Sequence, residues 1–340
     1  IESHYDIISS KVITAPSESI EEFIEKLITG FGDLNKSTGN IARAISFCFP
    51  GPADYAKGII GDLENLPFFK GGVPLKNILE EKFRIPVFIN NDGDLFTLGE
   101  AISGIIPEIN KELAEKGNSR IYKNLLGITL GTGTGGGIVI DGKLLIGDNS
   151  AGAEINRSNN FMDSSMSIEE TLSIRGVKTL YSNNSGISMD ECPEPGDIFK
   201  IAGGTVNGNK NAAIETWKLF GTVLGHSLAN AVTLVDGLIV IGGGLSGAYT
   251  MFMPTVIEAM NGKFTRIDGH KFQRLEVYAY NLEDPEGYNN FMKNEDVELS
   301  IFGSTKTITY SPVKKIGIGV SKLGTSKAVA IGAFAYASTQ

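Results

Sequence analysis

A run of glycines between two apolar stretches constrains the fold of this chain more than any other feature. The run is Leu130-Gly131-Thr132-Gly133-Thr134-Gly135-Gly136-Gly137, and it separates residues 125–130 from Ile138-Val139-Ile140. Glycines this dense at the end of a strand let backbone N–H groups converge on an anion, usually a phosphate. Asp141-Gly142 follows the second stretch and is typical of a two-residue hairpin turn. The segment therefore predicts a strand, a turn that could bind phosphate, a second strand and a hairpin.

Two other nucleotide motifs, and a tight turn without any ligand, are alternatives for this segment. Gly131, Gly133 and Gly136 have the G-x-G-x-x-G spacing of a dinucleotide fingerprint. That fingerprint needs a helix directly after the glycines, whereas here a strand follows, so a nicotinamide enzyme is disfavoured. No Gly-Lys-Ser/Thr closes the loop, so it is not a P-loop. The tight turn without a ligand stays open at this point.

The composition limits the class of protein. With 340 residues, 41% of them hydrophobic, the chain can form two domains with a real core. The net charge of −9 argues against nucleic acid or an anionic membrane as a partner. Cys48 and Cys192 form no disulfide framework and no C-x-x-C pair, which is typical of the reducing cytosol, so we expect a cytoplasmic protein. No secretory signal and no long apolar run are visible, so no transmembrane helix is predicted.

Alternating helix and strand patterns predict an α/β protein. Ser19 and Glu22 form a capping box before a helix that we expect to end near Gly30. Residues 108–124 look like a polar separator, and residues 262–322 are a mixed stretch with short strand-like runs. Strands are predicted over 42–49, 86–90 and 238–241, and helices over 74–83, 92–103, 168–180, 212–234 and 327–337.

Three groups of residues are candidates for a functional site. Asn91-Asp92 lies at a strand-to-helix junction, where a carboxylate can either cap the helix or accept the proton of a sugar hydroxyl. Glu154 and Glu169 could be solvated carboxylates near helix ends, or acceptors for neighbouring hydroxyls of a sugar. Gly242-Gly243-Gly244 either simply ends a buried strand or lets a flat adenine lie on the backbone.

Taken together and in chain order, these motifs resemble the ROK family of bacterial sugar kinases, part of the actin-like, hexokinase-like ATPase superfamily. The resemblance covers most of the chain, because several short motifs match in register. The matching segments are Phe49–Asp54 (P-G-P-V-D), Asn65–Pro67 (N-L-P), Asn91–Asp94 with Leu98–Glu100 (N-D-A-N and L-G-E), Gly131–Gly137 with Asp141–Leu144, Gly152–Glu154, Ile241–Gly244 (I-G-G-G) and Leu323–Ala333.

The resemblance implies a two-lobed actin-like ATPase fold, of the ribonuclease H-like kind, with a cleft between the lobes. Residues 1–110 with 325–340 would form a small lobe that holds the base, and residues 111–324 a large lobe with the phosphate and adenosine motifs. The family's opening D-x-G-G-T loop is not found. Because Ile1 falls about where the family's second or third strand begins, we expect the opening hairpin to be missing from this sequence. The resemblance also implies a homodimer.

The resemblance implies ATP-dependent phosphorylation of a hexose hydroxyl, most simply O6 as in a glucokinase. Asp92 would be the general base, and Mg²⁺ would arrive with ATP and bridge its phosphates. A non-catalytic, sugar-binding regulator of the ROK type is the alternative, although no helix-turn-helix is visible. The implied sugar contacts are Asn65, Asn91, Glu154, Arg157 and Glu169; the phosphate turn is Gly131, Thr132 and Gly133; the adenosine contacts are Gly242, Gly243 and Gly244.

Two departures from the family pattern bear on the site. Asn156-Arg157 stands where the family has Gly-His, and Ser167 replaces a cysteine of its zinc cluster, so no structural zinc is expected. Arg157 could instead reach a sugar hydroxyl or an acidic substituent. Asp94 replaces an asparagine and adds a negative charge, which would raise the pKa of Asp92.

Overall fold

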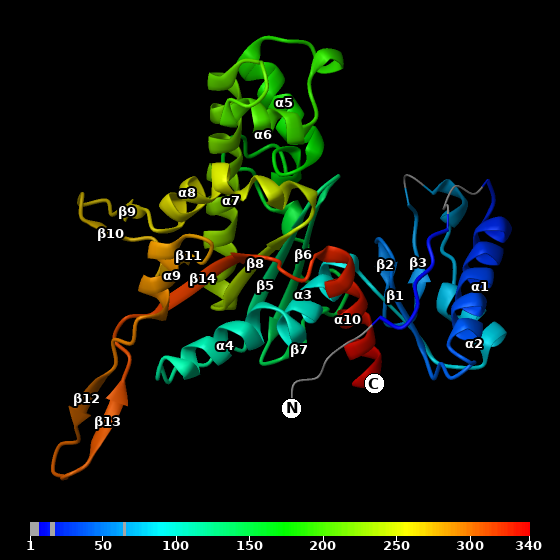
Figure 1. Ribbon diagram of the computed structural model, residues 1–340, viewed down its shortest axis with the longest axis horizontal. Helices are drawn as coiled ribbons and strands as arrows, with labels where there is room; N and C mark the ends of the chain where they lie inside the picture. The colour runs from blue at the N-terminus through cyan, green and yellow to red at the C-terminus, as the bar shows by residue number, and fades with distance from the viewer. Residues whose placement is uncertain (1–6, 14–17, 64–65) are drawn as a thin grey trace.

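A six-stranded sheet with the order β11-β14-β8-β5-β6-β7 forms the centre of the molecule (Figure 1). The computed structural model describes residues 7–13, 18–63 and 66–340. The antiparallel strands β6 (Thr134–Ile140) and β7 (Lys143–Leu144) complete one edge, which confirms the predicted glycine turn and Asp-Gly hairpin. The four parallel strands are β11 (Tyr278–Asn281), β14 (Lys315–Val320), β8 (Leu238–Gly242) and β5 (Leu125–Leu130).

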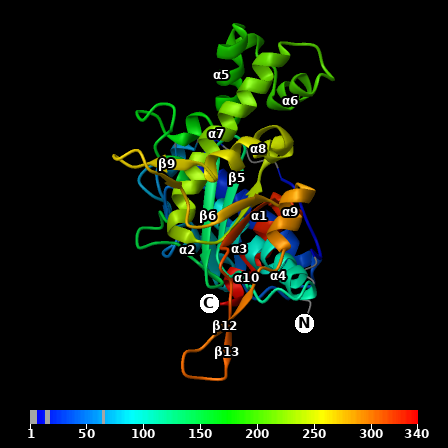
Figure 2. The ribbon, with the colours of Figure 1, turned by 90° about the vertical axis from the view of Figure 1, so that its left-hand side faces the viewer.

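Strand β8 divides the interior into two cores, because its apolar side chains alternate between the faces of the sheet. Ile239 and Ile241 pack under α7 (Lys210–Val235) and α8 (Tyr249–Met260). Two further helices, α5 (Ile174–Ser185) and α6 (Pro195–Gly203), extend this core along α7 beyond the end of the sheet (Figures 1 and 2). Both cores are covered by helices, which explains why the buried strand reads as one continuous apolar run.

Helices α3, α4, α9 and α10 cover the opposite face, where Leu238 and Val240 point. Among these helices, α3 and α10 cross at very short range: a Cβ at Gly99 would overlap the carbonyl oxygen of Ala328, and one at Gly332 would overlap that of Leu95. Only glycine permits this approach. The four helices are α3 (Asp92–Ser103), α4 (Ile105–Glu115), α9 (Pro285–Met292) and α10 (Thr325–Ser338).

A smaller unit packs beside the sheet, to the right in Figure 1. Its core contains an aromatic cluster in which the ring centroids of Phe23 and Phe69 lie 5.4 Å apart and those of Phe23 and Phe49 lie 5.8 Å apart. Its elements are α1 (Ile20–Ser37), β1 (Ile45–Cys48), β2 (Ala53–Asp54), β3 (Ile59–Ile60), η1 (Pro67–Phe69), α2 (Leu75–Phe83) and β4 (Val87–Asn90), with β1 and β4 paired in parallel.

The start of α1 is as predicted, but its end is not. Ser19 Oγ accepts a hydrogen bond from the Glu22 amide at 3.2 Å. The helix continues past Gly30 to Ser37, because Gly30 is a packing glycine: a Cβ there would lie 2.8 Å from Ile13 Cδ1. The chain turns at Gly39, whose φ is +76°, a backbone conformation that favours glycine.

Helix α10 joins the small unit to the large sheet. Besides crossing α3, it brings Tyr336 against Phe88 of β4, with ring centroids 6.1 Å apart. Helices α3 and α4 pack on the large sheet, although the predicted division places all of α3 and the first part of α4 within residues 1–110. The two-lobe boundaries therefore stay a prediction, whereas the α/β class is confirmed. Within the ranges that the structure describes, no helix is long and apolar enough to cross a membrane.

Candidate functional site

The proposed base lies at the first turn of α3, directly after β4 ends. Asn91 is the N-cap, because its Oδ1 accepts a hydrogen bond from the Gly93 amide at 2.8 Å. Asp92 Oδ1 also accepts from that amide, at 3.0 Å, but its side chain is exposed. Asn91 Nδ2 donates to the hydroxyl of Tyr55 at 3.4 Å. Asn91 thus performs the capping, and Asp92 keeps an accessible carboxylate.

The glycines of β6 bring this first turn onto the sheet. A Cβ at Gly93 would lie 2.5 Å from the carbonyl oxygen of Gly136, and one at Gly137 would lie 2.5 Å from that of Gly93. Thr97 Oγ1 fills the next turn by donating to the Gly93 carbonyl at 2.8 Å. The glycine run therefore has two parts: its second half allows α3 to pack closely, and only its first half forms the turn.

The turn between β5 and β6 presents backbone amides. The Gly131 amide donates to the Gly133 carbonyl at 2.9 Å, and the Thr134 amide donates to Glu169 Oε2 at 2.8 Å. The amides of Thr132 and Gly133 donate to no acceptor in the described part of the chain. Two free amides at the end of a strand can donate hydrogen bonds to a phosphate.

Glu169 links this turn to a cavity. It belongs to the short 3₁₀ helix η3 (Ile168–Glu170), whereas the sequence pattern predicted one continuous helix over 168–180. A Cβ at Gly133 would lie 2.7 Å from Glu169 Oε2, so the glycine makes room for the carboxylate. The same side chain lines a cavity of about 690 Å³. One carboxylate therefore contacts both the phosphate turn and the cavity.

This cavity lies between the small unit and the large sheet. Arg157 and Glu169, two of the predicted sugar contacts, line it. Asn91, Glu154 and the proposed base Asp92 are not among its lining residues, and Asn65 falls outside the described residues. Oδ1 of Asn156 is buried without a hydrogen-bond partner. The residues that line the cavity are Pro50, Gly51, Pro52, Asp62, Leu63 and Leu66 from the small unit, and Asn156, Arg157, Ser167, Glu169, Glu170 and Arg175 from the large unit.

Sequence reasoning missed Asp62 and Arg175 as cavity residues, and it treated Asn156 only as a departure from the family pattern. Arg175 pairs with Glu170, with 2.6 Å between Nη2 and Oε1. The Asp62 carboxylate accepts from the Gly71 amide at 2.6 Å. No spacing in the sequence connects these residues, because they come together only when the two units pack.

Carboxylates gather around the buried side chain of Asp94. This residue is 4% exposed, and its Oδ1 has no hydrogen-bond partner. Burial, reinforced by the negative charges of Glu154 and Asp92, raises the pKa of Asp94 to about 8. Burial also raises the pKa of the neighbouring Tyr55 hydroxyl. Glu154 is thereby placed close to the start of α3.

Asp94 is the buried member of the Asp92–Asp94 pair, and burial raises the pKa of Asp94 itself, which the sequence did not predict. The expected effect of Asp94 on Asp92 stays a prediction. At neutral pH Asp94 is mostly protonated, so it adds little charge beside the exposed Asp92. A neutral carboxylic acid has nearly the shape of the asparagine that the family motif has at this position.

The three glycines after β8 differ in what they accommodate. A Cβ at Gly242 would lie 2.6 Å from Cζ of Phe96, and one at Gly243 would overlap the carbonyl oxygen of Leu130. The Gly243 amide donates to Thr325 Oγ1 at 3.0 Å. Gly244 is exposed and has open space around it. The packing of the protein explains the first two glycines, and Gly244 alone offers backbone to a ligand.

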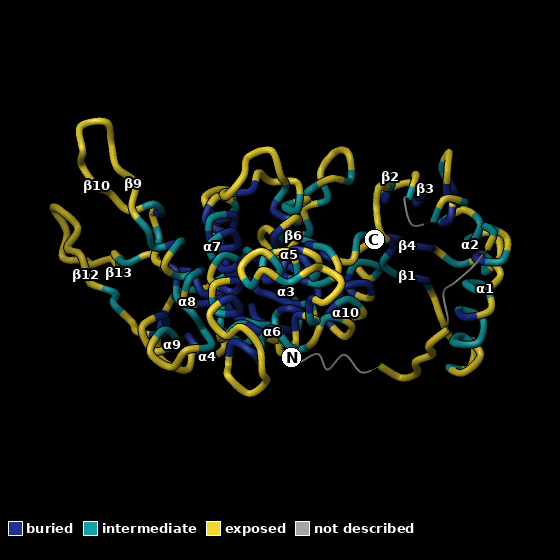
Figure 3. Tube along the Cα trace, turned by 90° about the horizontal axis from the view of Figure 1, so that it is seen from above, coloured by how far each residue is buried: buried dark blue, intermediate teal, exposed yellow. Residues whose placement is uncertain are grey.

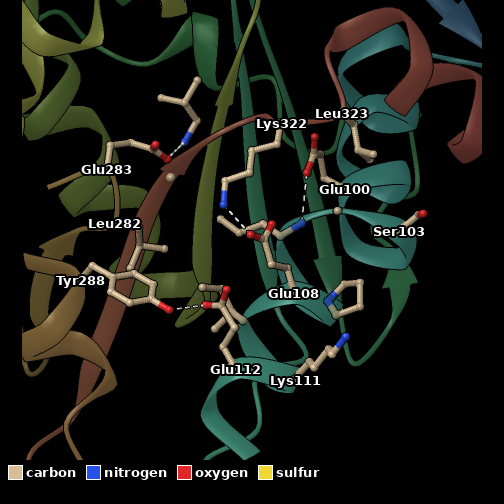
Figure 4. Close-up of a pocket in the computed structure, with 16 residues that line it drawn as sticks. Glu100, Ser103, Glu108, Lys111, Glu112, Leu282, Glu283, Tyr288, Lys322 and Leu323 are labelled. Carbon is tan, nitrogen blue, oxygen red and sulfur yellow. Dashed lines mark hydrogen bonds and ion pairs between the residues drawn. The ribbon is translucent and has the colours of Figure 1, made fainter. Parts of the chain in front are cut away.

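A second cavity, of about 390 Å³, lies beyond the carboxyl ends of β11 and β14 (Figure 4). Its charged side chains bind one another: Lys322 pairs with Glu108, and the Tyr288 hydroxyl donates to Glu112 at 2.6 Å. Glu283 accepts from the Val320 amide at 2.8 Å. Because these groups already have protein partners, we assign no ligand to this cavity. Among the described side chains, no cluster of three or more His, Cys, Asp and Glu is arranged to hold a metal.

Comparisons with known proteins agree on one family. A sequence model of the ROK family matches residues 1–287. A crystal structure of glucokinase from Parabacteroides distasonis ATCC 8503 is similar, with a TM-score of 0.90 and 43% identity over 98% of this chain and 91% of that chain. The N-acetylgalactosamine kinase AgaK of Shewanella sp. (strain ANA-3) is 30% identical over 47% of this chain, and the match spans only 50% of that relative. N-acetyl-D-glucosamine kinase of Photobacterium profundum is 24% identical over 79% of this chain and 92% of its own length.

Proposed function

The chain belongs to the ROK family and has its two-lobed actin-like ATPase fold, and from this we propose that it is an ATP-dependent hexose kinase. The proposed reaction transfers the γ-phosphoryl group of ATP to a sugar hydroxyl. Relatives named glucokinase, N-acetylgalactosamine kinase and N-acetyl-D-glucosamine kinase support this class of reaction. The sugars in these three names are all hexose derivatives: glucose has a hydroxyl on C2 where the other two have an N-acetyl group, and those two differ from each other in the configuration at C4.

The position of Glu169 is the observation that carries the proposal. Its carboxylate lines the 690 Å³ cavity and also accepts from the Thr134 amide, 2.8 Å away. Phosphoryl transfer is mainly a matter of positioning, since attacking and leaving oxygens must be roughly in line. A residue shared by the sugar cavity and the phosphate turn would place acceptor and donor side by side. The amides of Thr132 and Gly133 would then hold the phosphates.

In the proposed mechanism, Asp92 accepts the proton of the sugar hydroxyl while the oxygen of that hydroxyl attacks the γ-phosphorus. The new oxygen–phosphorus bond forms while the bond to the β–γ bridging oxygen breaks, and ADP leaves. A positioned general base contributes roughly 10²–10⁴ in rate. The exposed carboxylate of Asp92 suits this role, since its partner Asn91 already caps the helix. Mg²⁺ bound to ATP would neutralise the charge that develops on the phosphates.

We propose O6 as the acceptor, because the primary hydroxyl projects from the sugar ring and could reach the phosphate while the ring hydroxyls contact the walls of the cavity. Glu169 and Arg157 line those walls, and Asn156 adds an unpartnered acceptor, which a sugar O–H or N–H group could satisfy. The contacts from Asn65, Asn91 and Glu154 are part of the same proposal. Gly242, Gly243 and Gly244 are proposed to hold the adenosine, with Gly244 offering the accessible backbone.

The remaining expectations are proposals of the same kind. The lobes would comprise residues 1–110 with 325–340, and residues 111–324. We propose a homodimer in the cytoplasm, with sugar and ATP as ligands and no structural zinc. The free thiols of Cys48 and Cys192 support a reducing compartment.

A coupled assay of ADP release over a panel of hexoses and N-acetylhexosamines tests the proposal. Asp92→Asn should lower kcat by roughly 10²–10⁴ while calorimetry still detects sugar binding. Asp190→Asn, an exposed aspartate of η4 (Met189–Glu191), is the matched control and should leave kcat unchanged. A wild-type protein that binds sugar but releases no ADP in its presence would refute the kinase and favour the non-catalytic regulator.

A further inference from the structure

Two hairpins project from the body of the molecule on the side away from the small unit (Figures 1 and 3). The first, the basic arm (residues 262–274), pairs β9 (Lys263–Thr265) with β10 (Lys271–Gln273). The second, the acidic arm (residues 295–311), pairs β12 (Val297–Ser300) with β13 (Thr307–Tyr310). Each is an isolated two-stranded sheet that does not join the central one. In the end-on view the arms lie at different heights (Figure 2).

Both arms expose apolar side chains, although in the basic arm the guanidinium groups of Arg266 and Arg274 lie over the rings of Phe272 and Phe264, at 5.3 and 5.5 Å from the ring centroids. Every residue of the four strands is exposed, and the arms are yellow along most of their length in Figure 3. Ile267 and Phe302, near the two tips, are as exposed as in an extended chain, at 110% and 105%. The other exposed apolar residues are Phe264 and Phe272 in the basic arm, and Val297, Leu299, Ile301, Ile308 and Tyr310 in the acidic arm.

An arm of this kind needs a covering surface. A two-stranded hairpin alone is marginally stable in water, because it has no second layer to bury its side chains. Large exposed apolar patches on soluble proteins mark sites of interaction. Inside the basic arm the rings of Phe264 and Phe272 contact each other, with centroids 5.9 Å apart, but both remain exposed. The arms are therefore shaped for contact with another macromolecule.

The charges of the two arms are opposite. The basic arm contains Lys263, Arg266, Lys271 and Arg274 against a single acidic residue, Asp268. The acidic arm contains Glu295, Asp296 and Glu298 against a single basic residue, Lys306. Glu295 already pairs with Lys315 and Lys293 of the same chain, so Asp296 and Glu298 are the charges that this arm offers to a partner. The whole chain has a net charge of −9, so two copies repel each other unless positive and negative patches meet. A second copy of this chain presents the matching charge for each arm.

We propose that the two arms form the interface of a homodimer, in which the basic arm of each copy packs against the acidic arm of the other. A two-fold axis makes such a contact twice, since both partners present the same pair of complementary surfaces. The apolar side chains then fill the centre of the interface and the charges set its register. This inference rests on the homodimer part of the proposed function, and it does not depend on the catalytic reaction. The sugar cavity lies toward the small unit, so association leaves it open.

Light scattering coupled to size-exclusion chromatography tests the interface on the full chain. The wild type should be a dimer, and Phe302→Ser combined with Ile308→Ser should raise the dimer dissociation constant about tenfold or more. Both residues are already exposed, so the variant should keep its fold and its ADP-release activity per chain. Leu234→Ser, which removes an apolar side chain 87% exposed on α7, is the matched control and should leave the dimer intact.

A charge exchange tests whether the arms meet each other rather than a different surface. Lys271→Glu and Glu298→Lys should each weaken the dimer, and the double variant should restore it, because the pair is then reversed across the interface. A monomeric wild type, a dimer that the arm variants do not weaken, or a double variant no better than the singles would overturn the inference. Loss of ADP release in a protein that still dimerises would count against the proposed kinase and not against the arms.

Discussion

Replacing Asp94 by asparagine should stabilise the protein, and increasingly so as the pH rises. The folded protein holds the pKa of Asp94 at about 8, against an ordinary value of 3.8. Between these values the folded state binds a proton that the unfolded state has released, so stability falls as the pH increases through this window. Asparagine has nearly the same shape and binds no proton, so the variant escapes this loss.

The size of the effect follows from the shift. Each pH unit between the two pKa values is worth about 1.36 kcal/mol, so the gain of Asp94→Asn should be about 2 kcal/mol at pH 5 and about 4 kcal/mol at pH 7. It should level off near about 6 kcal/mol above pH 8, once Asp94 is ionised in both states. The residue is 4% exposed, so solvent screening does not reduce these figures much.

Urea unfolding at pH 5, 7 and 9 measures the difference directly. Trp217, the single tryptophan of the chain, is buried in the core and reports unfolding by fluorescence. The exposed Asp190→Asn should track the wild type at every pH. If Asp94→Asn and the wild type lose stability in parallel between pH 5 and pH 9, Asp94 is ionised in the folded protein and the argument from burial is wrong.

Three further predictions address the packing and the turn. Gly99→Ala should lower the free energy of unfolding by about 2 kcal/mol, measured by thermal unfolding, because the added Cβ overlaps a backbone oxygen of α10. Gly32→Ala, which has open space in α1, is the control and should raise that free energy by up to about 1 kcal/mol. Equal changes in the two variants would contradict the close crossing. Gly131 has open space around it, so Gly131→Ala should leave the stability unchanged but raise the KM for ATP. An unchanged KM would indicate that this turn does not bind the nucleotide. Lys315→Met should lower the free energy of unfolding in urea by about 3 kcal/mol, because the buried ammonium lies 2.7 Å from Glu295 and also donates to two backbone carbonyls. An unchanged free energy of unfolding would refute that role.

Local patterns predicted those parts of the fold whose structure depends on short segments. The glycine turn and the Asp141-Gly142 hairpin follow from residues that adopt the required backbone without help from the rest of the chain. The helix over 92–103 was predicted correctly at both ends. Asn91, a residue type that commonly caps helices, precedes its first residue, and Gly104 follows its last residue. Strand β8 was predicted because it is apolar throughout.

Helix α4 shows where this reasoning failed. Residues 108–124 were expected to be a polar separator, yet Ile105–Glu115 is helical. The apolar residues Ile105, Ile109 and Leu113 recur at the helical spacing of four, but most of the positions between Ile109 and Glu115 are polar or charged. Pro107 lies in the first turn, where proline is tolerated, so it does not break the helix. The amphipathic pattern was present, and the polar composition obscured it.

The site could be predicted in part only. Asp92 and Asn91 were found because they lie together at the end of a strand. The contact between Glu169 and the Thr134 amide joins residues that are far apart in the chain, and no spacing reveals it. The raised pKa of Asp94 was missed for the same reason, because a pKa depends on burial, and burial is a property of the packed protein.

The close crossing of α3 and α10 has a consequence for the order in which the molecule can assemble. Helix α3, which starts at Asp92, is synthesised long before α10, whose first residue is Thr325. Until α10 leaves the ribosome, the glycine surface of α3 around Gly99 has no helix to cover it. A nascent chain can complete the core under α7 and α8 first, whereas the layer around Asp92, the proposed base, closes only once α10 has been made. Mutations that slow this final docking would leave a chain that is folded over most of its length and inactive.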